Sequence, residues 1–349
     1  MRIAVLAGGV GGARFLAGVK AHLGWQPDGS APADSPDEII AIVNTADDIR
    51  LHGLQICPDL DSCLYTLSGQ ADTERGWGRA GETWTVSREL ADYGAEAPWF
   101  SLGDKDIATH LVRTRMLDAG YPLSAVMAAI GERWQPGVRL LPMSDDRVET
   151  HVVVDRPAAD RAQDGAQGGA QGGAQAGADG DTERVALHFQ EWWVRYRAGL
   201  TPHAITPVGA DVATPAPGVL EAIRDADLVL IAPSNPVVSI GTILAVPGIR
   251  EAIRSTAAPV VGVSPLIDDK PIRGHADICL AAIGVEATAQ AVGRHYGARS
   301  VDGLLDGYLV AEGESADVPG VLVADIPLLM TDPGATAAMV AACRRLVGI

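Results

Sequence analysis

The sequence predicts an α/β protein built on a parallel sheet, and two observations support that prediction. The first is a set of short apolar runs that each end in a glycine-rich or polar turn, at 2–7, 38–43, 227–232 and 259–263. Continuous rather than alternating hydrophobicity is typical of strands that are buried on both faces. The second is the helical spacing of apolar residues at 13–23, directly after the first run. In such sheets ligands bind at the carboxyl ends of the strands, which is where the polar turns fall.

The middle of the chain has a different composition and hydrophobic pattern. Residues 64–141 contain Trp77, Trp84, Trp99 and Trp134 and no strand-like run. Asp104 is placed to cap a helix that ends at Gly120, and Pro122 is placed to open another helix through Ile130. On the first of these helices, one side would carry Ile107, Leu111, Val112 and Leu117. We therefore expect a small inserted helical subdomain at 64–141, within a core formed by 1–63 and 142–349.

Residues 157–181 form a slipped repeat of Ala-Gln-Gly-Gly with almost no bulky apolar side chain. Such a segment cannot offset the entropy cost of ordering it. We expect a low-complexity loop within the core that joins two strands, at 149–155 and 184–190.

Charge and composition exclude several classes of protein. The chain has 349 residues, with 27 Lys and Arg against 44 Asp and Glu, so its formal net charge is −17. A general nucleic-acid surface would need the opposite balance. A phosphorylated substrate remains possible where a metal ion, a helix N-terminus or an arginine cluster reverses the local field. No apolar run approaches the roughly 18 residues of a membrane span. The four scattered cysteines form no C-x-x-C pair, which favours reduced thiols and a cytoplasmic protein.

A glycine-rich turn follows the first predicted strand and precedes a predicted helix. Its candidate ligand-binding residues are Gly9, Gly11, Gly12 and Arg14. Glycines let a backbone approach an anion closely, and free N–H groups at a helix start point toward it. The dinucleotide pattern G-x-G-x-x-G fails because Arg14 stands at its third glycine position, and the P-loop lysine is absent. The alternative is a tight turn that needs glycine for steric reasons only.

Four carboxylates follow the second predicted strand within fifteen residues: Asp47, Asp48, Asp59 and Asp61. Gathered in a cleft they would repel one another unless a cation joined them. Mg²⁺ is a hard ion that takes oxygen ligands and often bridges carboxylates to substrate phosphates. The alternative is a set of ordinary Asx turns with a helix cap at Asp61, because an apolar helix follows.

Each of two further motifs has two possible interpretations. Ser234 and Asn235 follow the run at 227–232, where they either contact a phosphate or nucleotide base or simply cap a turn. The segment 192–197 interleaves aromatic residues with arginines, which suits either a planar ligand or core packing. No Cys/His spacing predicts zinc, and no G-x-S-x-G elbow predicts a serine hydrolase. Residue patterns alone thus predict an α/β enzyme for a phosphorylated or nucleotide ligand, with Mg²⁺.

Taken in order, several motifs resemble the 2-phospho-L-lactate transferase (CofD/FbiA) family of coenzyme F-420 biosynthesis, and its actinobacterial FbiA branch in particular. The matching segments are GGVGGARFLAGV, VNTADD, ICPDLDSCLYTLSG, RGWG, LGDKDIATH, RLLPMSDD, HFQEWWVRYR and APSNPVVSIGTIL. The resemblance covers nearly the whole chain except the Ala-Gln-Gly-Gly segment. It implies a Rossmann-like three-layer core with a small helical insertion, and a homodimer.

The resemblance also implies a reaction. A phospholactyl or phosphoenolpyruvyl group passes from a guanosine diphosphate-linked donor to the ribityl hydroxyl of FO (7,8-didemethyl-8-hydroxy-5-deazariboflavin), GMP leaves, and Mg²⁺ is required. Asp61 and Ser101 match positions that bind FO in the family. Asp61 and Asp48 are the catalytic candidates, while Asp47, Asp48, Asp59 and Asp61 are the metal candidates. The candidates for binding the guanine nucleotide and its diphosphate are Gly9, Gly11, Gly12, Arg14, Ser234 and Asn235.

Three points stay open at this stage. The acyl group of the donor is not fixed by the sequence, and a metal-polarised attack without a dedicated base is as consistent as a carboxylate base. A CofD-like regulatory protein that binds nucleotide sugars without transferase activity is the main alternative. The acidic PDLD turn and the tryptophan-rich insertion favour the enzyme. An NAD(P)-dependent oxidoreductase is disfavoured by Arg14, which breaks the glycine pattern.

Overall fold

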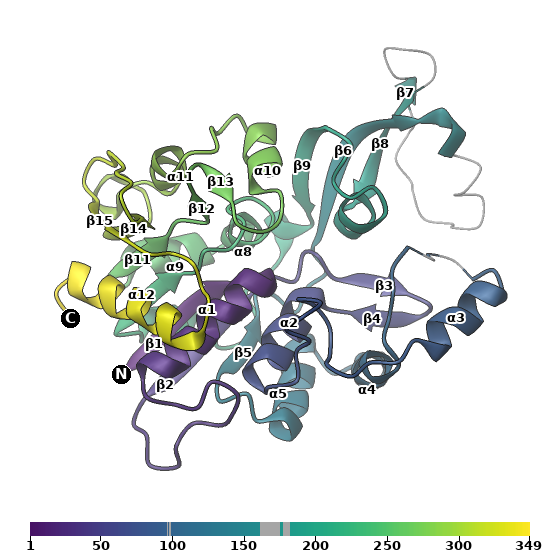
Figure 1. Cartoon of the computed structure of the whole chain (residues 1–349), viewed down its shortest axis with the longest axis horizontal. Coiled ribbons are helices and arrows are strands. Elements are labelled where there is room, and N and C mark those ends of the chain that lie inside the picture. Colours follow the sequence, from purple (N-terminus) through teal and green to yellow (C-terminus); the bar gives the residue numbers. More distant parts are fainter. Residues whose placement is uncertain (96, 98, 161–174, 177–181) are drawn as a thin grey trace.

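The computed structural model describes residues 1–95, 97, 99–160, 175–176 and 182–349. Its centre is a seven-stranded parallel sheet in the order β15-β14-β11-β10-β1-β2-β5 (Figure 1). Its strands are β1 (Arg2–Ala7), β2 (Glu38–Val43), β5 (Arg139–Pro142), β10 (Leu228–Ile231), β11 (Val260–Val263), β14 (Gly307–Ala311) and β15 (Leu322–Ile326). The four predicted apolar runs are β1, β2, β10 and β11, so the α/β prediction with a parallel sheet is confirmed.

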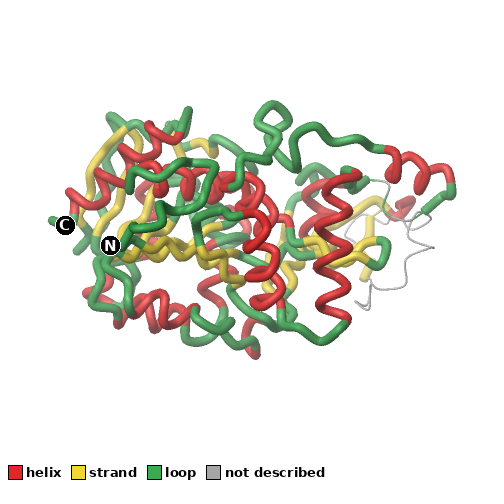
Figure 2. Tube along the Cα trace, turned by 90° about the horizontal axis from the view of Figure 1, so that it is seen from below, coloured by secondary structure: helices red, strands yellow, loops and turns green. Residues whose placement is uncertain are grey.

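Helices cover both faces of this sheet, which gives three layers (Figure 2). Side chains of β1 alternate between the faces: Ile3 and Val5 pack in one hydrophobic cluster, and Ala4 and Leu6 pack in the other. The first face is covered by α1 (Gly9–His22), α2 (Pro58–Leu67), α5 (Leu123–Trp134) and α12 (Pro333–Leu346). The second is covered by α7 (Val219–Arg224), α8 (Ile240–Ala245), α9 (Ile249–Ser255), α10 (Ala276–Ala282) and α11 (Ala289–Tyr296). This double coverage explains why the strand sequences are continuously apolar.

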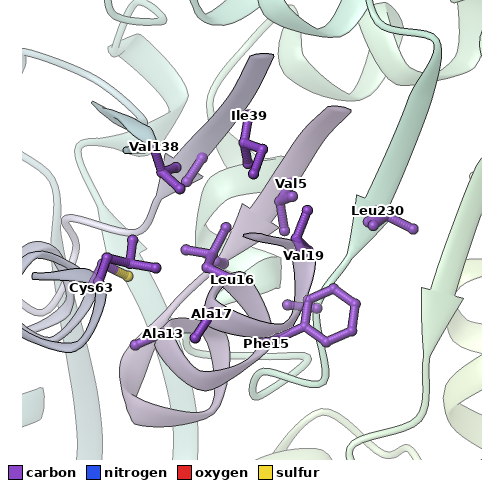
Figure 3. Close-up of a cluster of buried hydrophobic side chains, with 14 of the residues drawn as sticks. Val5, Ala13, Phe15, Leu16, Ala17, Val19, Ile39, Cys63, Val138 and Leu230 are labelled. Atoms are coloured by element: carbon purple, nitrogen blue, oxygen red, sulfur yellow. The ribbon is translucent and has the colours of Figure 1, made fainter. Parts of the chain in front are cut away.

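Helix α1 fixes the position of the glycine turn. Its side chains Phe15, Leu16 and Val19 are fully buried and face Val5 and Ile39 of the central strands (Figure 3). Burying one such side chain contributes about 1.5–3 kcal/mol. Because α1 also lies alongside α12 and α2, its N-terminus is held at the carboxyl end of β1.

A buried lysine ties this layer together. Lys20 of α1 has no exposed surface, and its Nζ donates hydrogen bonds to the carbonyl oxygens of Gly29 (2.6 Å), Leu67 (3.0 Å) and Pro136 (2.7 Å). Burial lowers the pKa of Lys20 to about 8, against a smaller upward effect of Asp28. The lysine thus links α1, the end of α2 and the approach to β5.

The segment predicted to be helical contains α3 (Thr85–Asp92), α4 (Asp104–Asp118) and α5. Helices therefore occur where they were expected, but the predicted cap of α4 is wrong. Gly103 is the cap, and the Asp104 carboxylate accepts instead from the N–H groups of Thr85 and Val86. The apolar residues grouped on one side of α4 are not its buried residues, because Leu111 and Val112 are 48% and 52% exposed. The buried side chains of α4 are instead Thr109, His110, Arg113 and Thr114. The helix turns a polar side inward because that side faces the cleft described below.

Division of the chain into a core at 1–63 and 142–349 and an insertion at 64–141 stays a prediction. Two observations bear on where any boundary would fall. Helix α2 runs across 63–64, and strand β5 runs across 141–142. Val126, Met127 and Ile130 of α5 share a hydrophobic cluster with β1 and β2, so this helix is part of the central layers.

A second, antiparallel sheet stands beside the central one (Figure 1). Its order is β7-β8-β6-β9, with strands β6 (Glu149–Pro157), β7 (Gln175–Ala176), β8 (Thr182–His188) and β9 (Pro202–Val208). The strands predicted at 149–155 and 184–190 are β6 and β8, which pair with His151 opposite His188. Of the low-complexity loop predicted at 157–181, residues 161–174 and 177–181 lie outside the described residues.

Two short hairpins complete the fold. Strands β3 (Ile49–Leu51) and β4 (Leu54–Ile56) form one, and β12 (Leu266–Ile267) and β13 (Lys270–Pro271) form the other. Among the described residues, no helix combines the length and apolar character needed to cross a membrane.

Candidate active site

A cleft of about 1090 Å³ opens at the carboxyl ends of the central strands. Nine of the eleven residues singled out from the sequence line it: Gly9, Gly11, Arg14, Asp47, Asp59, Asp61, Ser101, Ser234 and Asn235. The other two, Gly12 and Asp48, lie behind this lining. Segments that are far apart in the chain therefore meet at one place, as the parallel sheet requires.

The glycine turn serves both packing and the cleft. Gly12 lies so close to Ala7 and Ser234 that a Cβ would come within 2.9 Å of each. A Cβ on Gly8 would fall 2.6 Å from the Cβ of Ser239. Gly9 instead has a φ of +62° and, with Gly11, lines the cleft. The steric interpretation thus holds for Gly8 and Gly12, while Gly9 and Gly11 stay available to a ligand at the N-terminus of α1.

Ser234 joins the end of β10 to the turn after β1, and Asn235 caps the turn that follows β10. The Ser234 hydroxyl accepts from the Gly8 N–H (3.1 Å) and donates to the Gly8 carbonyl (2.8 Å). Oδ1 of Asn235 accepts from the backbone N–H groups of Val237 and Val238 (2.9 and 3.3 Å). The capped-turn interpretation therefore describes the side-chain oxygen of Asn235, whereas the Ser234 hydroxyl is bonded to Gly8; both residues also line the cleft.

Asn44 is a buried residue of this site that the sequence analysis did not select. Its Nδ2 donates to Asp59 (3.0 Å), and its Oδ1 accepts from the Ala46 N–H (2.9 Å) and the Thr242 hydroxyl (2.7 Å). It has no exposed surface. Asn44 thus fixes Asp59 relative to the turn after β2 and the turn before α8.

Three of the predicted metal ligands form a buried acidic group. Burial, and then the charge of Asp59, raises the pKa of Asp47 well above its usual value, and burial does the same to the pKa of Asp48. Burial raises the pKa of Asp59 to about 6, although hydrogen bonds from Asn44 and the Gly9 N–H oppose the shift. Within the described residues, Oδ1 of Asp47 and Oδ1 of Asp48 are buried without a hydrogen-bond partner. Unpartnered buried oxygens in a set of hard ligands fit a divalent cation such as Mg²⁺.

Asp61 is held differently. Helix α2 begins at Pro58, so Asp61 stands inside its first turn rather than at its cap. Arg113 of α4 donates to Asp61 Oδ2 from Nη1 (3.0 Å) and to Oδ1 from Nη2, and both side chains are buried. His110 Nδ1 lies 3.6 Å from the same carboxylate. Because a guanidinium already neutralises Asp61, this carboxylate needs no metal ion for charge balance.

The polar contacts continue from His110 to the edge of the cleft. His110 Nε2 lies 3.5 Å from Asp106 Oδ1, and the Tyr65 hydroxyl donates to the same oxygen (2.5 Å). Asp61, Asp106 and His110 bring ligand atoms within 4.8 Å of one another, an arrangement that can hold a metal ion. The fixed positive charge of Arg113 beside Asp61 disfavours an ion there.

Aromatic and cationic side chains form a further part of the cleft wall. Trp77, Trp99, Phe100 and Trp193 line the cleft, together with the arginines Arg14, Arg197 and Arg273. Arg75 lies over the rings of Trp77 and Trp84, at 4.7 and 5.0 Å from their centroids. The two interpretations of 192–197 apply to different residues. Trp192 is buried and donates to the Leu200 carbonyl (2.7 Å), whereas Trp193 faces the cleft.

The residues that sequence reasoning missed share a recognisable signal. Asp106, His110, Arg113 and Thr114 recur on α4 at helical spacing, which marks a polar stripe on one side of the helix. A polar stripe of this kind usually faces solvent, because helices of soluble proteins bury their apolar side. Arg273 carries no comparable signal, because it reaches the cleft from a hairpin that nothing in the local sequence places there.

The comparisons with known proteins agree with this geometry. The family model described as 2-phospho-L-lactate transferase CofD matches residues 3–319. Among curated relatives, a phosphoenolpyruvate transferase of Nocardia farcinica is 58% identical over 348 residues, covering 100% of this chain and 95% of the relative. Those of Mycolicibacterium smegmatis and Mycobacterium tuberculosis are 57% and 53% identical, each covering 100% of this chain and 99% of the relative.

Solved structures support the fold. A crystal structure of a Bacillus halodurans protein aligns with a TM-score of 0.55 and 19% sequence identity, covering 99% of each chain.

A three-layer α/β fold with a glycine turn, buried carboxylates and arginines at the carboxyl ends of its strands defines a class of enzyme that acts on phosphorylated small molecules. Within that class, the chain belongs to the 2-phospho-L-lactate transferase CofD family, and it is an enzyme that transfers phospho-acid groups.

Proposed function

We propose that this enzyme transfers a phosphoenolpyruvyl group from a guanosine diphosphate-linked donor to the ribityl hydroxyl of FO, with Mg²⁺ as cofactor. One observation carries the proposal: a single large cleft joins a glycine turn and buried carboxylates to a wall of aromatic rings. Such a cleft suits a diphosphate at one end and a planar deazaflavin ring at the other. Phosphoenolpyruvyl is preferred to phospholactyl because the relatives at 53–58% identity are named phosphoenolpyruvate transferases.

In the proposal, the diphosphate of the donor binds at the N-terminus of α1. Gly9 and Gly11 present backbone there without a side chain in the way, and the helix dipole favours an anion. Asp47 and Asp59 line the cleft beside this turn, and Asp48 stands behind them. In the proposal these carboxylates hold Mg²⁺, which would neutralise charge on the phosphates during transfer.

In the proposal, the acceptor hydroxyl of FO binds next to Asp61. Arg113 fixes the direction of this carboxylate, so Asp61 is placed to accept a hydrogen bond from the hydroxyl that attacks phosphorus. The new bond joins the hydroxyl oxygen to phosphorus, and the bond from that phosphorus to the oxygen of GMP breaks, with its electron pair going to GMP. The hydroxyl proton is released to solvent. Ser101 lines the same cleft and remains a candidate contact for FO. Positioning and charge neutralisation account for most of the rate in this kind of reaction.

The proposal is tested by incubating the protein with FO, Mg²⁺ and the enolpyruvyl donor, followed by mass spectrometry of the deazaflavin. Formation of the phosphoenolpyruvyl adduct together with GMP is the expected result. Unmodified FO, with the donor shown to be intact, would mean that the acceptor is wrongly assigned. A homodimer stays part of the proposal, and analytical ultracentrifugation of the full chain tests it.

A further inference from the structure

The cationic wall of the cleft contains two arginines that the proposed reaction does not yet use as a pair. Arg14 lies on α1 and is half-buried, and Arg273 follows β13 and is exposed. Both line the cleft. Among the hydrogen bonds, ion pairs and ring contacts of the described residues, neither guanidinium has a partner, whereas Asp61 and Asp59 do.

The two guanidiniums enter the same cleft from different elements, Arg14 from α1 and Arg273 from the segment after β13. Burial, and then the charge of Arg273, lowers the pKa of Arg14. Arg273 lies close to the loop that carries Trp77, because a Cβ on Gly76 would fall 2.6 Å from Arg273 Nη1. Two like charges facing one space in a partly enclosed cleft are unfavourable unless an anion lies between them.

We propose that Arg14 and Arg273 together bind the carboxylate of the phospho-acid part of the donor. This inference rests on the proposed function. The donor has two anionic groups, and its diphosphate already has a place at the N-terminus of α1 beside Asp47 and Asp59. The carboxylate is the anion left without a partner, and a planar carboxylate matches the paired N–H groups of a guanidinium. The pair would then select donors by their acid group.

The test compares two ligands that differ in this group. The enolpyruvyl donor carries diphosphate and carboxylate, whereas GDP carries the diphosphate alone. Their affinities are measured by calorimetry in the presence of Mg²⁺ for the wild type and for Arg14→Gln, Arg273→Gln and Arg273→Lys. Arg294→Gln serves as the matched control, because Arg294 is an exposed arginine of α11 that does not line the cleft. Thermal unfolding checks that each variant is folded.

In this assignment Arg14 binds the carboxylate and not the diphosphate for which it was a candidate. We therefore expect Arg14→Gln and Arg273→Gln to weaken donor binding about ten- to hundredfold, while GDP binding changes less than about twofold. Arg273→Lys keeps the charge but not the paired geometry, so its affinity for the donor should lie between that of the Gln variants and that of the wild type. Equal losses for donor and GDP would overturn the assignment in favour of the diphosphate. Unchanged donor affinity in both Gln variants would overturn the site itself.

Failure of the proposed function gives a different result. A wild type that binds the donor through these arginines but leaves FO unmodified contradicts the acceptor, not the carboxylate site. A wild type that binds GDP but not the donor contradicts the carboxylate site.

Discussion

Arg113 donates from both of its terminal nitrogens to the two carboxylate oxygens of Asp61, and Arg113 has no exposed surface. The pair joins the middle of α4 to the first turn of α2. It also accounts for the polar inner side of α4, since an arginine buried at that depth requires an anionic partner. Positioning of Asp61 at the cleft therefore depends on a buried residue that does not line the cleft.

Arg113→Met should be strongly destabilising. The substitution leaves Asp61 buried without its partner, which costs about 3–5 kcal/mol. Urea unfolding of the purified variant measures the loss. The double variant Asp61→Asn with Arg113→Met removes both charges, so it should regain part of the stability while transferring no phospho-acid group. A single variant within about 1 kcal/mol of the wild type would show that the pair does not hold α2 and α4 together.

Lys20→Met should lower stability without altering the cleft. Three carbonyl oxygens lose the ammonium that satisfies them, and we expect a loss of at least about 2 kcal/mol. The matched control is Lys270→Met, an exposed lysine whose replacement should stay within about 0.5 kcal/mol. Donor and acceptor KM values of the folded Lys20 variant should equal those of the wild type, because Lys20 does not line the cleft. Equal unfolding midpoints for the two variants would contradict this role.

The sequence predicts more of the fold than of the site. Strands β1, β2, β10 and β11 were predictable because burial on both faces leaves a continuous apolar run. The inner side of α4 was not, since the rule that apolar residues point inward fails where a helix borders a polar cleft. Asn44, His110 and Arg113 act through partners that are distant in the chain, and local patterns do not reveal such partners. The carboxylates and glycines were predictable because they follow strands directly.

His188 should make stability depend on pH between 4 and 6.5. Its Nδ1 accepts from the Gln190 N–H (3.1 Å), so its Nε2 carries the hydrogen that points at the Asp48 carbonyl (3.1 Å). Burial lowers the pKa of His188 from 6.5 to about 4. The unfolded chain therefore binds more protons in this range, and folding stability falls as the pH drops from 6.5 toward 4.

The comparison that isolates this effect is with His188→Gln. The wild-type free energy of unfolding should decline relative to the variant by up to about 3 kcal/mol between pH 6.5 and 4. Parallel pH profiles for the two proteins, measured by urea unfolding, would rule out a buried neutral His188.

Mg²⁺ should raise the thermal unfolding midpoint through Asp47 and Asp59. A cation relieves the repulsion of these buried carboxylates in the folded state and has no comparable site in the unfolded chain. The increase should disappear in Asp59→Asn and persist in Asp211→Asn, which changes a carboxylate of an exposed turn. An equal increase in both variants would place the ion elsewhere.

The most direct test of the central claim compares the wild type with Asp61→Asn in the transfer reaction itself. Both are incubated with FO, Mg²⁺ and the enolpyruvyl donor, and the deazaflavin product and GMP are quantified by mass spectrometry. We predict stoichiometric adduct and GMP from the wild type, and a rate at least about a hundredfold lower from Asp61→Asn with donor binding retained. Release of GMP without an FO adduct, or an Asp61→Asn rate equal to that of the wild type, would contradict the proposed reaction at this cleft.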